Sequence, residues 1–364
     1  MKKRLIWPDI MKIVAIFGVI VVHVSAPYLV PFSTSREWWI GNIYDSLARW
    51  CVPLFVMVSG ALLLPKAENI PFQQFLFVRV RRVLVPFLTW SALYFLYRIH
   101  MKGDALALTD FFRMVLTEPI YYHLWFIYML IVLYLLAPAI SAFLNESPKQ
   151  HAWYLIALWF SWVSILPIIE RPLDIETYFT PGMDDYSPIK LSGYFLLGYM
   201  FRDWRARSGF QFCMALLLFL AGGALTIIGT YVMSLNRGEF HPFFYNYFSI
   251  SVVFMSVSLF ILVKSAFHAP HEITADGGEK SRTRSMHFLQ KIGMSVFGVY
   301  LIHALVLELL RDGRLGFTID HTTAFGVTFP LEAGLSIFAL SIFIFSLLPV
   351  LIIRFIPFVR DTIT

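Results

Sequence analysis

Residues 7–29 read WPDIMKIVAIFGVIVVHVSAPYL, an apolar stretch interrupted by three ionisable side chains. A helix that crosses a bilayer needs roughly 20 mainly apolar residues, so this stretch is long enough to span one. Pro8 suits a helix start, and Trp7 and Tyr28 suit the two membrane interfaces. Pro27 is a poor residue just after a cleavage site, so we expect a retained first helix rather than a signal peptide.

The whole chain shares this apolar character. Apolar residues make up 58% of the 364 residues and charged residues only 14%. A soluble domain has about 45–50% apolar residues and about 25% charged residues. This composition excludes intrinsic disorder, and two cysteines exclude a disulfide scaffold. The net charge of +6 is scattered over short segments between apolar runs, so we expect a lipid bilayer and no nucleic acid as partner.

A 20-residue apolar template predicts an all-α, polytopic membrane protein with about ten transmembrane helices. The predicted segments are about 7–29, 48–64, 80–98, 122–143, 152–169, 187–202, 210–234, 244–267, 293–310 and 329–353. Most of the 29 Lys and Arg residues then fall on the cytoplasmic side if both termini are cytoplasmic. We expect one membrane domain, 1–364, with a flexible cytoplasmic loop at about 264–291.

The first helix carries the clearest functional candidates, because ionisable groups inside spanning helices are costly. Lys12 and His23 are eleven residues apart, which turns a helix about 20° beyond three full turns and rises about 16 Å. Both side chains therefore lie on one face, with His23 in the outer half of the membrane. Asp9 is placed to form an ion pair with Lys12. A histidine that is merely buried in a helix bundle is the alternative interpretation of His23.

A second basic cluster lies in FVRVRRVLVPF, residues 77–87. Arg79 and Arg82 are spaced i, i+3, so their guanidinium groups share a helical face and can grip phosphate or carboxylate oxygens. The alternative is a plain anchor that follows the positive-inside rule, a role that fits Arg81.

Two further histidines stand in apolar surroundings, His123 in YYHLWFIY and His303 in FGVYLIHALVLELL. Taken singly, each favours a structural role over a catalytic one. Tyr122, His123 and Trp125 would lie near the outer mouth, where they are candidates to bind a substrate, with packing as the alternative. The sequence contains no HExxH or paired CxxC spacing, so no metal site is expected.

These residues resemble the acyltransferase 3 family of integral membrane proteins along almost the whole chain. The matching segments are the Lys12 to His23 spacing, VPLFVMVSGALL at 52–63, the Arg79 and Arg82 pair, HLWFIYML followed by Tyr134 and Pro138, GYFLLGY, and SVFGVYLIH. Lys12 stands where arginine is usual, which keeps the charge but loses the bidentate fork. YHLWF and CVPLFVMVSG look most like the branch that O-acetylates enterobacterial common antigen.

The resemblance implies an enzyme of the bacterial inner membrane without a permanently bound cofactor. It would move an acyl group from cytoplasmic acyl-CoA, commonly acetyl-CoA, to a cell-surface polysaccharide or lipid-linked oligosaccharide. Lys12, Arg79 and Arg82 would hold the phosphates of CoA. His23 would act as general base or as acyl carrier, and Asp9 would orient Lys12.

Two other classes of function remain open at this point. A glycan or lipid-linked sugar transporter, or flippase, also keeps ionisable groups in its helices, although no two halves of this sequence match each other. If the chain were instead a structural or sensory membrane protein, the alignment of Lys12 with His23 on one helical face would be a coincidence.

Overall fold

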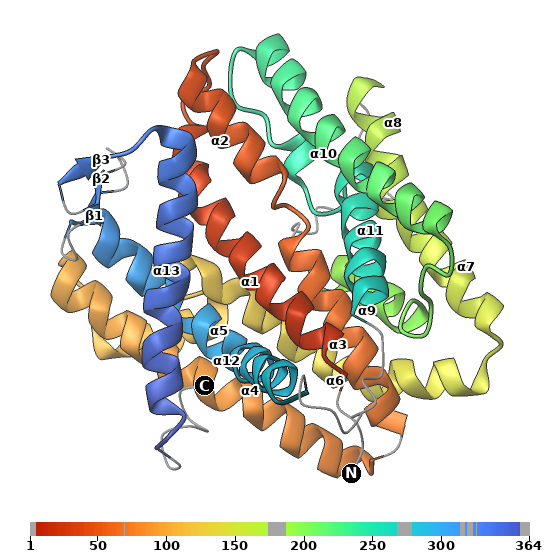
Figure 1. Ribbon diagram of the computed structural model, residues 1–364. Coiled ribbons are helices and arrows are strands. Elements are labelled where there is room, and N and C mark those ends of the chain that lie inside the picture. The colour runs from red at the N-terminus through yellow and green to blue at the C-terminus, as the bar shows by residue number, and fades with distance from the viewer. Residues whose placement is uncertain are drawn as a thin grey trace.

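The computed structural model describes residues 5–68, 70–173, 187–267, 279–313, 317–318, 323–324 and 326–356. Within these ranges it is a bundle of α-helices with one small sheet (Figure 1). The elements are α1 Trp7–Ser25, η1 Ala26–Tyr28, α2 Arg36–Ser46, α3 Cys51–Glu68, α4 Phe72–Tyr97, η2 Arg98–Lys102, α5 Leu108–Thr117, η3 Tyr122–Leu124, α6 Trp125–Glu146, α7 Lys149–Phe160, η4 Ser161–Ile165, α8 Leu166–Leu173, α9 Pro188–Met200, α10 Gly209–Arg237, η5 Phe243–Tyr245, α11 Ile250–Ala266, α12 Glu279–Arg311, β1 Phe317–Thr318, β2 Thr323–Ala324, β3 Val327–Thr328 and α13 Leu331–Ile353.

The predicted all-α membrane class is confirmed, and helices occupy all ten expected segments. The sequence did not predict α2, α5 or the antiparallel strands β1, β2 and β3, which pair in that order between α12 and α13. The mean hydropathy of α2 is close to zero because its apolar and polar residues balance, so an apolar template passes over it.

Eight stretches of the described residues are long and apolar enough to cross a membrane, which makes the chain a multi-pass membrane protein. They are Trp7–Tyr28, Arg36–Ala67, Leu108–Glu146, Lys149–Glu170, Gly209–Arg237, Phe243–Ala266, Met286–Arg311 and Leu331–Ile353. Neither α4 nor α9 is among them. The 13 residues of α9 reach about 20 Å, short of a hydrocarbon core of about 30 Å, and three arginines divide the apolar sequence of α4.

The expected loop at 264–291 is shorter than predicted. Helix α11 continues to Ala266 and α12 already begins at Glu279, so residues 279–291 are helical. Glu, Lys, Arg and Met in this segment are good helix formers, which extend α12 beyond its apolar part. Residues 268–278 of the expected loop lie outside the described residues. Cys51 and Cys213 are both free thiols.

Helix α1 lies at the centre of the bundle. It packs against α2, α3, α11, α12 and α13, and Figure 1 shows it passing between α13 and α3. Met11, Ile16 and Ile20 on α1 are completely or almost completely buried. At its start, the Trp7 ring meets the Phe260 ring of α11 edge to face at 5.6 Å between centroids. Of the ionisable residues of α1, Asp9 is also buried and Lys12 and His23 are partly buried.

Small residues let α3 and α9 approach closely. A Cβ atom added to Gly60 on α3 would lie 1.9 Å from the carbonyl oxygen of Phe195 on α9, and one added to Gly198 on α9 would lie 1.9 Å from the carbonyl of Met57. Contacts between small residues drive helix association in membranes, where lipid competes with apolar packing. This contact fixes short α9 to a longer helix.

We expect Gly60→Ala to destabilise the protein, because its methyl group would force α3 and α9 apart. Overpacking of this kind costs about 1–3 kcal/mol, measurable as a lower Tm in detergent. Gly209→Ala is the control, since a Cβ there meets nothing within 4 Å. A Tm for Gly60→Ala equal to that of the control would show that this close contact does not determine stability.

Candidate functional site

The ionisable pair at the start of α1 is anchored to α12. The Lys12 Nζ donates to Asp9 Oδ1 at 2.7 Å and to the carbonyl oxygen of Gly293 at 3.0 Å, so the predicted ion pair is confirmed. Asp9 is buried, with 2% of its surface exposed. A Cβ atom at position 293 would lie 2.4 Å from the Asp9 Cβ. The absence of a side chain at Gly293 therefore lets Asp9 and Lys12 pack closely against α12.

His23 meets the same helix further along α1. Its ring stacks on the ring of His303 in α12, with 5.4 Å between centroids and 20° between planes. Lys12 contacts residue 293 and His23 contacts residue 303, so the two helices run parallel at this contact. The prediction that Lys12 and His23 share one face of α1 is confirmed, and that face is turned toward α12.

Three histidines form a cluster at this point. The rings of His123 and His303 are 5.1 Å apart, and His303 stacks on His23. The Nδ1 atom of His303 contacts the carbonyl oxygen of Tyr300. Because a carbonyl only accepts, Nδ1 carries the hydrogen, and in a neutral imidazole Nε2 then keeps a lone pair.

Polar atoms in this cluster depart from the usual rule. The His303 Nε2 and both His123 ring nitrogens are buried and have no hydrogen-bond partner among the described residues, whereas most buried polar groups have one. Sequence reasoning did not place His303 beside His23, because the register of α12 along α1 is a tertiary property. The sequence signal that could have pointed to His303 was the family-like segment SVFGVYLIH, which ends with this residue.

The three predicted substrate-binding residues lie in different surroundings. Tyr122, in η3, is 45% exposed, and its ring meets the His23 ring edge to face at 5.0 Å. His123 is only 2% exposed and lies within the cluster instead of at an open mouth. The Trp125 ring stacks against the Tyr247 ring at 6.2 Å. Tyr122 thus connects His23 to the surface.

A cavity of about 1050 Å³ opens among α1, α3, α4, α6, α12 and α13. This volume is slightly above the range of about 300–1,000 Å³ for small-molecule sites. In the described part of the chain, every charged side chain that lines the cavity is basic. These are Lys12, Arg79, Arg81, Arg82 and Arg354. The predicted cation set is thus brought together, and Arg81 and Arg354 join it.

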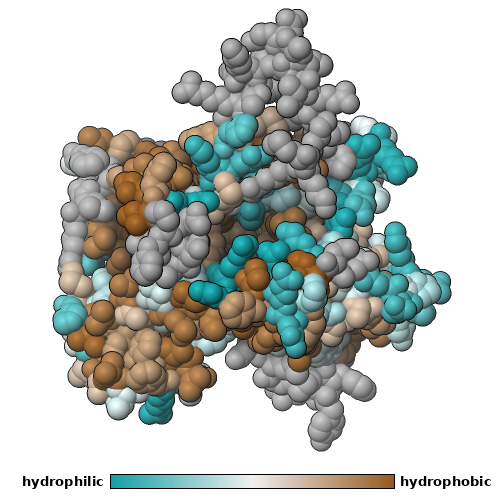
Figure 2. Space-filling model, turned by 90° about the horizontal axis from the view of Figure 1, so that it is seen from below, coloured by the Kyte–Doolittle hydropathy of each residue, from teal (hydrophilic) through white to brown (hydrophobic). Residues whose placement is uncertain are grey.

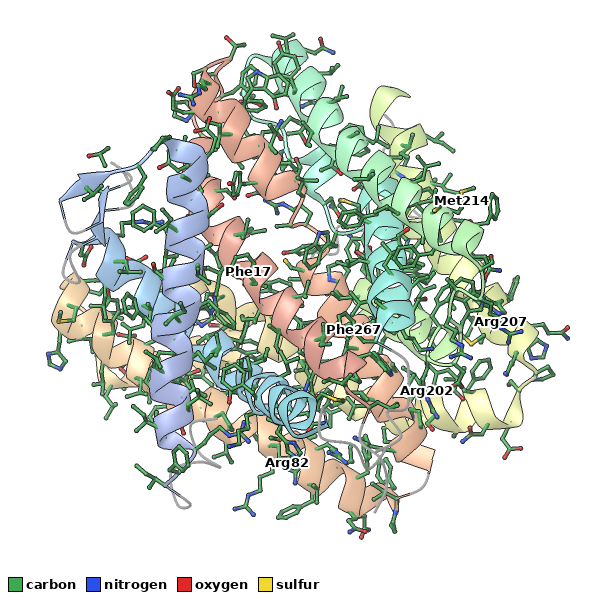
Figure 3. The ribbon with its side chains drawn as sticks, in the orientation of Figure 1. Phe17, Arg82, Arg202, Arg207, Met214 and Phe267 are labelled. Carbon is green, nitrogen blue, oxygen red and sulfur yellow. The ribbon has the colours of Figure 1, made fainter. Side chains whose placement is uncertain are left out.

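Arg82 projects at the lower end of the molecule, where α4 runs (Figures 1 and 3). Seen from this end, hydrophilic residues gather across the middle of the face and hydrophobic residues flank them (Figure 2). On α4, the Nε atom of Arg79 is buried and makes no hydrogen bond within the described residues. Its fork therefore keeps hydrogen-bonding capacity for an anion.

The inner part of the cavity ends at aromatic rings. Phe126 and Tyr300 line it, and the Tyr300 ring centroid is 5.5 Å from that of His123 and 5.6 Å from that of His303. The Tyr300 hydroxyl donates to the backbone carbonyl of His123. His23 is not among the lining residues. The Tyr300 ring lines the cavity and contacts the His303 ring, which stacks on His23, so the contacts from the cavity to His23 run through these two rings.

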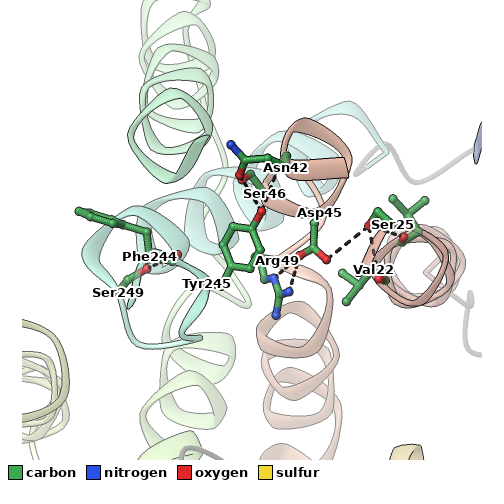
Figure 4. A network of polar contacts seen from close by, with 10 residues as sticks. Val22, Ser25, Asn42, Asp45, Ser46, Arg49, Phe244, Tyr245 and Ser249 are labelled. Atoms are coloured by element: carbon green, nitrogen blue, oxygen red, sulfur yellow. Dashed lines mark hydrogen bonds and ion pairs between the residues drawn. The ribbon is translucent and has the colours of Figure 1, made fainter. Parts of the chain in front are cut away.

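A buried polar network supports the opposite end of α1 (Figure 4). Asp45 forms an ion pair with Arg49 and accepts a hydrogen bond from Ser25 at 3.3 Å. The Arg49 guanidinium lies 4.2 Å from the Tyr245 ring centroid, and the Tyr245 hydroxyl donates to Asn42 Oδ1 at 2.6 Å. Ser25 lies two residues beyond His23, so this network fixes the end of α1 that carries the histidine.

Near Tyr122, a second ion-pair group joins α12 to η2. Glu308 accepts from Lys102 Nζ at 2.6 Å and lies 3.6 Å from Arg311. The hydrogen bond to Glu308 raises the pKa of Lys102 above its ordinary value. Lys102 and Arg311 thus both lie beside the Glu308 carboxylate, whereas the described residues that line the cavity include no carboxylate.

A sequence profile described as an acyltransferase domain, that of the acyltransferase 3 family, matches residues 5–355. The chain belongs to this family. No curated protein and no solved structure matches it, so the comparisons do not extend to a particular branch of the acyltransferase 3 family. Membership makes the chain a membrane acyltransferase and favours an enzyme over a transporter.

We expect Asp45→Asn to destabilise this acyltransferase, because the Arg49 charge would lose its carboxylate while it remains largely buried. Removing one partner of a buried pair costs about 3–5 kcal/mol, measured as a fall in Tm. Asp110→Asn, a change at the start of exposed α5, is the comparison and should lower Tm by much less. Equal falls in Tm for the two variants would show that the Asp45 network does not stabilise the protein more than an exposed carboxylate does.

Proposed function

We propose that the chain is an O-acetyltransferase that moves an acetyl group from cytoplasmic acetyl-CoA to a hydroxyl of a cell-surface glycan or a lipid-linked oligosaccharide. The observation that carries the proposal is the arrangement along α1. One face of this helix presents Lys12 to a basic cavity and His23 to a histidine cluster about 16 Å further on.

The basic cavity suits the anionic end of acyl-CoA. Arg79 and Arg82 can grip phosphate oxygens with their forks, and Lys12 adds a third charge that Asp9 holds in place. In surroundings of low dielectric such charges interact strongly with phosphate. The thin pantetheine arm would extend from this end toward Tyr300.

His23 would carry out the chemistry as a general base. The acceptor oxygen forms a bond to the thioester carbonyl carbon while its proton moves to a ring nitrogen of His23. The carbon–sulfur bond then breaks, and the CoA thiolate takes the proton. In the alternative sequence, a ring nitrogen of His23 attacks the thioester carbonyl and displaces the CoA thiolate. The acceptor oxygen then takes the acyl group, the acyl–nitrogen bond breaks, and the hydroxyl proton passes to the thiolate. Either way the thioester must pass the Tyr300 ring, so Tyr300 rotates in the proposed cycle.

The acceptor would approach from the side of Tyr122, which is exposed and contacts His23. An aromatic face can stack on a sugar ring while its hydroxyl remains wet. In this proposal both termini are cytoplasmic, α4 and α9 complete ten crossings, and the bacterial inner membrane holds the protein. Helix α1 starts and α13 ends in the lower half of Figure 1, which supports one side for both termini.

His23→Ala should lower the rate of acetyl transfer by about 10²–10⁴-fold, which is the usual contribution of general acid–base catalysis. The assay is transfer from radiolabelled acetyl-CoA to glycan in membrane vesicles, with acetylated glycan detected by mass spectrometry. His151→Ala, which alters an exposed histidine of α7, should retain full activity. Retained transfer by a folded His23→Ala protein would remove His23 from the mechanism, and glycan movement without covalent change would indicate a transporter.

Arg79→Ala should raise KM for acetyl-CoA about tenfold or more, since a charged hydrogen bond contributes about 1.5–3 kcal/mol. The control is Arg202→Ala, which changes a basic residue at the end of α9 (Figure 3) that does not line the cavity. The KM of the control should match that of the unmodified protein. A KM for Arg79→Ala that does not change would reduce this arginine to a topology anchor.

A further inference from the structure

Helix α5 connects α4 to α6 close to Tyr122, at the end of the bundle that carries His23. It belongs to an apolar stretch of 39 residues, Leu108–Glu146, of which α6 alone supplies 22. A helix of 22 residues extends about 33 Å and the hydrocarbon core is about 30 Å thick, so α6 is long enough to cross without α5. Glu118, directly after α5, has an extended backbone. Helix α5 is therefore a separate element with a direction of its own.

The side chains of α5 form three faces, because each residue turns the helix by 100°. An apolar face is strongly exposed, at 72%, 64% and 84% for Leu108, Phe112 and Leu116. A polar face is also exposed and consists of Thr109, Arg113 and Thr117. A packed face lies against the core and consists of Phe111, Met114 and Val115. The apolar face lies between the packed face and the polar face.

The packed face holds α5 on its two neighbours. The Phe111 ring meets the Phe95 ring of α4 edge to face, with 5.3 Å between centroids. The Tyr128 hydroxyl of α6 donates to the carbonyl oxygen of Val115 at 2.9 Å. Leu96, next to Phe95 on α4, is 50% exposed, so both helices carry exposed apolar side chains at this contact. These contacts fix the orientation of α5 and leave its apolar face uncovered by the described residues.

Neither water nor hydrocarbon alone suits α5. A continuous stripe of exposed Leu and Phe side chains is unfavourable in water, and a stripe with an exposed arginine is unfavourable in hydrocarbon. A short helix that has both stripes is stable where the two phases meet. Tyr and Trp residues, which favour the membrane interface, gather in the elements next to α5. They are Tyr97, Tyr121, Tyr122, Trp125 and Tyr128.

We propose that α5 binds the bilayer interface, with its apolar face among the acyl chains and its polar face among the lipid headgroups. The long side chain of Arg113 then extends toward lipid phosphate. Arg98 Nη1 donates to the carbonyl oxygen of Ile120 at 3.3 Å, which fixes the segment between α5 and Tyr122. The depth of α5 therefore sets the depth at which Tyr122 is exposed. This lipid-binding surface goes beyond the proposed function and does not depend on it.

The test measures the surroundings of single nitroxide labels on the full-length protein in phosphatidylcholine nanodiscs. Labels are attached to introduced cysteines in a Cys213→Ser background, because Cys213 is exposed whereas Cys51 is buried. Each label is probed by collision with oxygen, which concentrates in hydrocarbon, and with a nickel chelate, which stays in water. The quantity compared is the ratio of oxygen accessibility to nickel accessibility.

We expect this ratio to exceed one for Phe112→Cys and Leu116→Cys, on the apolar face. It should fall below one for Thr109→Cys and Thr117→Cys, the matched controls on the polar face of the same helix. All four side chains are exposed, so the labels should leave the fold intact, which an unchanged Tm checks. Leu108→Cys, also on the apolar face, replaces either apolar position if that variant does not fold.

Each other outcome would overturn the proposal. A ratio below one on the apolar face would show that this face lies in water, and low accessibility to both reagents would show that protein covers it. A ratio above one at all four positions would place α5 inside the hydrocarbon as part of a crossing. No acyl-CoA or acceptor enters the measurement, so its result is separate from the success or failure of the proposed function.

Discussion

The contact between α1 and α12 is the constraint on which the site depends. At one end the buried Asp9 carboxylate approaches Gly293 so closely that a side chain there would collide with it, and Lys12 binds the carbonyl of the same residue. Removing a charge from water is expensive unless a partner and hydrogen bonds compensate. The ion pair, the backbone acceptor and the glycine therefore form one unit that sets the register of the two helices.

That register decides what lies beside His23. Because α1 and α12 run parallel from residues 12 and 293, the His23 ring comes to lie on the His303 ring, and His303 in turn contacts His123 from η3. A shift of one residue on α12 would turn His303 about 100° away. Features at the basic cavity thus control the geometry of the histidine cluster, although the two are about three helical turns apart.

Much of this arrangement follows from the sequence and part of it does not. The helical periodicity of α1 was sufficient to pair Asp9 with Lys12 and to place Lys12 and His23 on one face, since these relations are local. His303 and Arg354 were not predicted to belong to the site, because their positions depend on packing between helices that are far apart in the chain. The same reason explains Gly293, which has no special role until Asp9 lies against it. Helix α2 was missed because it is too polar for an apolar template, yet it carries the Asp45 carboxylate that supports α1.

The separation of the basic cavity from the histidine cluster has a physical reason. Arginine and lysine side chains are costly in the middle of a bilayer and are tolerated near its edge, where water reaches them. A neutral imidazole loses far less on burial than an ion does, so histidines are suited to the interior. In the function proposed above, the enzyme binds a polyanionic coenzyme and acts on a hydroxyl inside the membrane domain, which would require two sites, with cations at the edge and imidazoles inside. Helix α1 connects the two sites because Lys12 and His23 are spaced by nearly an integral number of turns, and α12 matches it with Gly293 and His303.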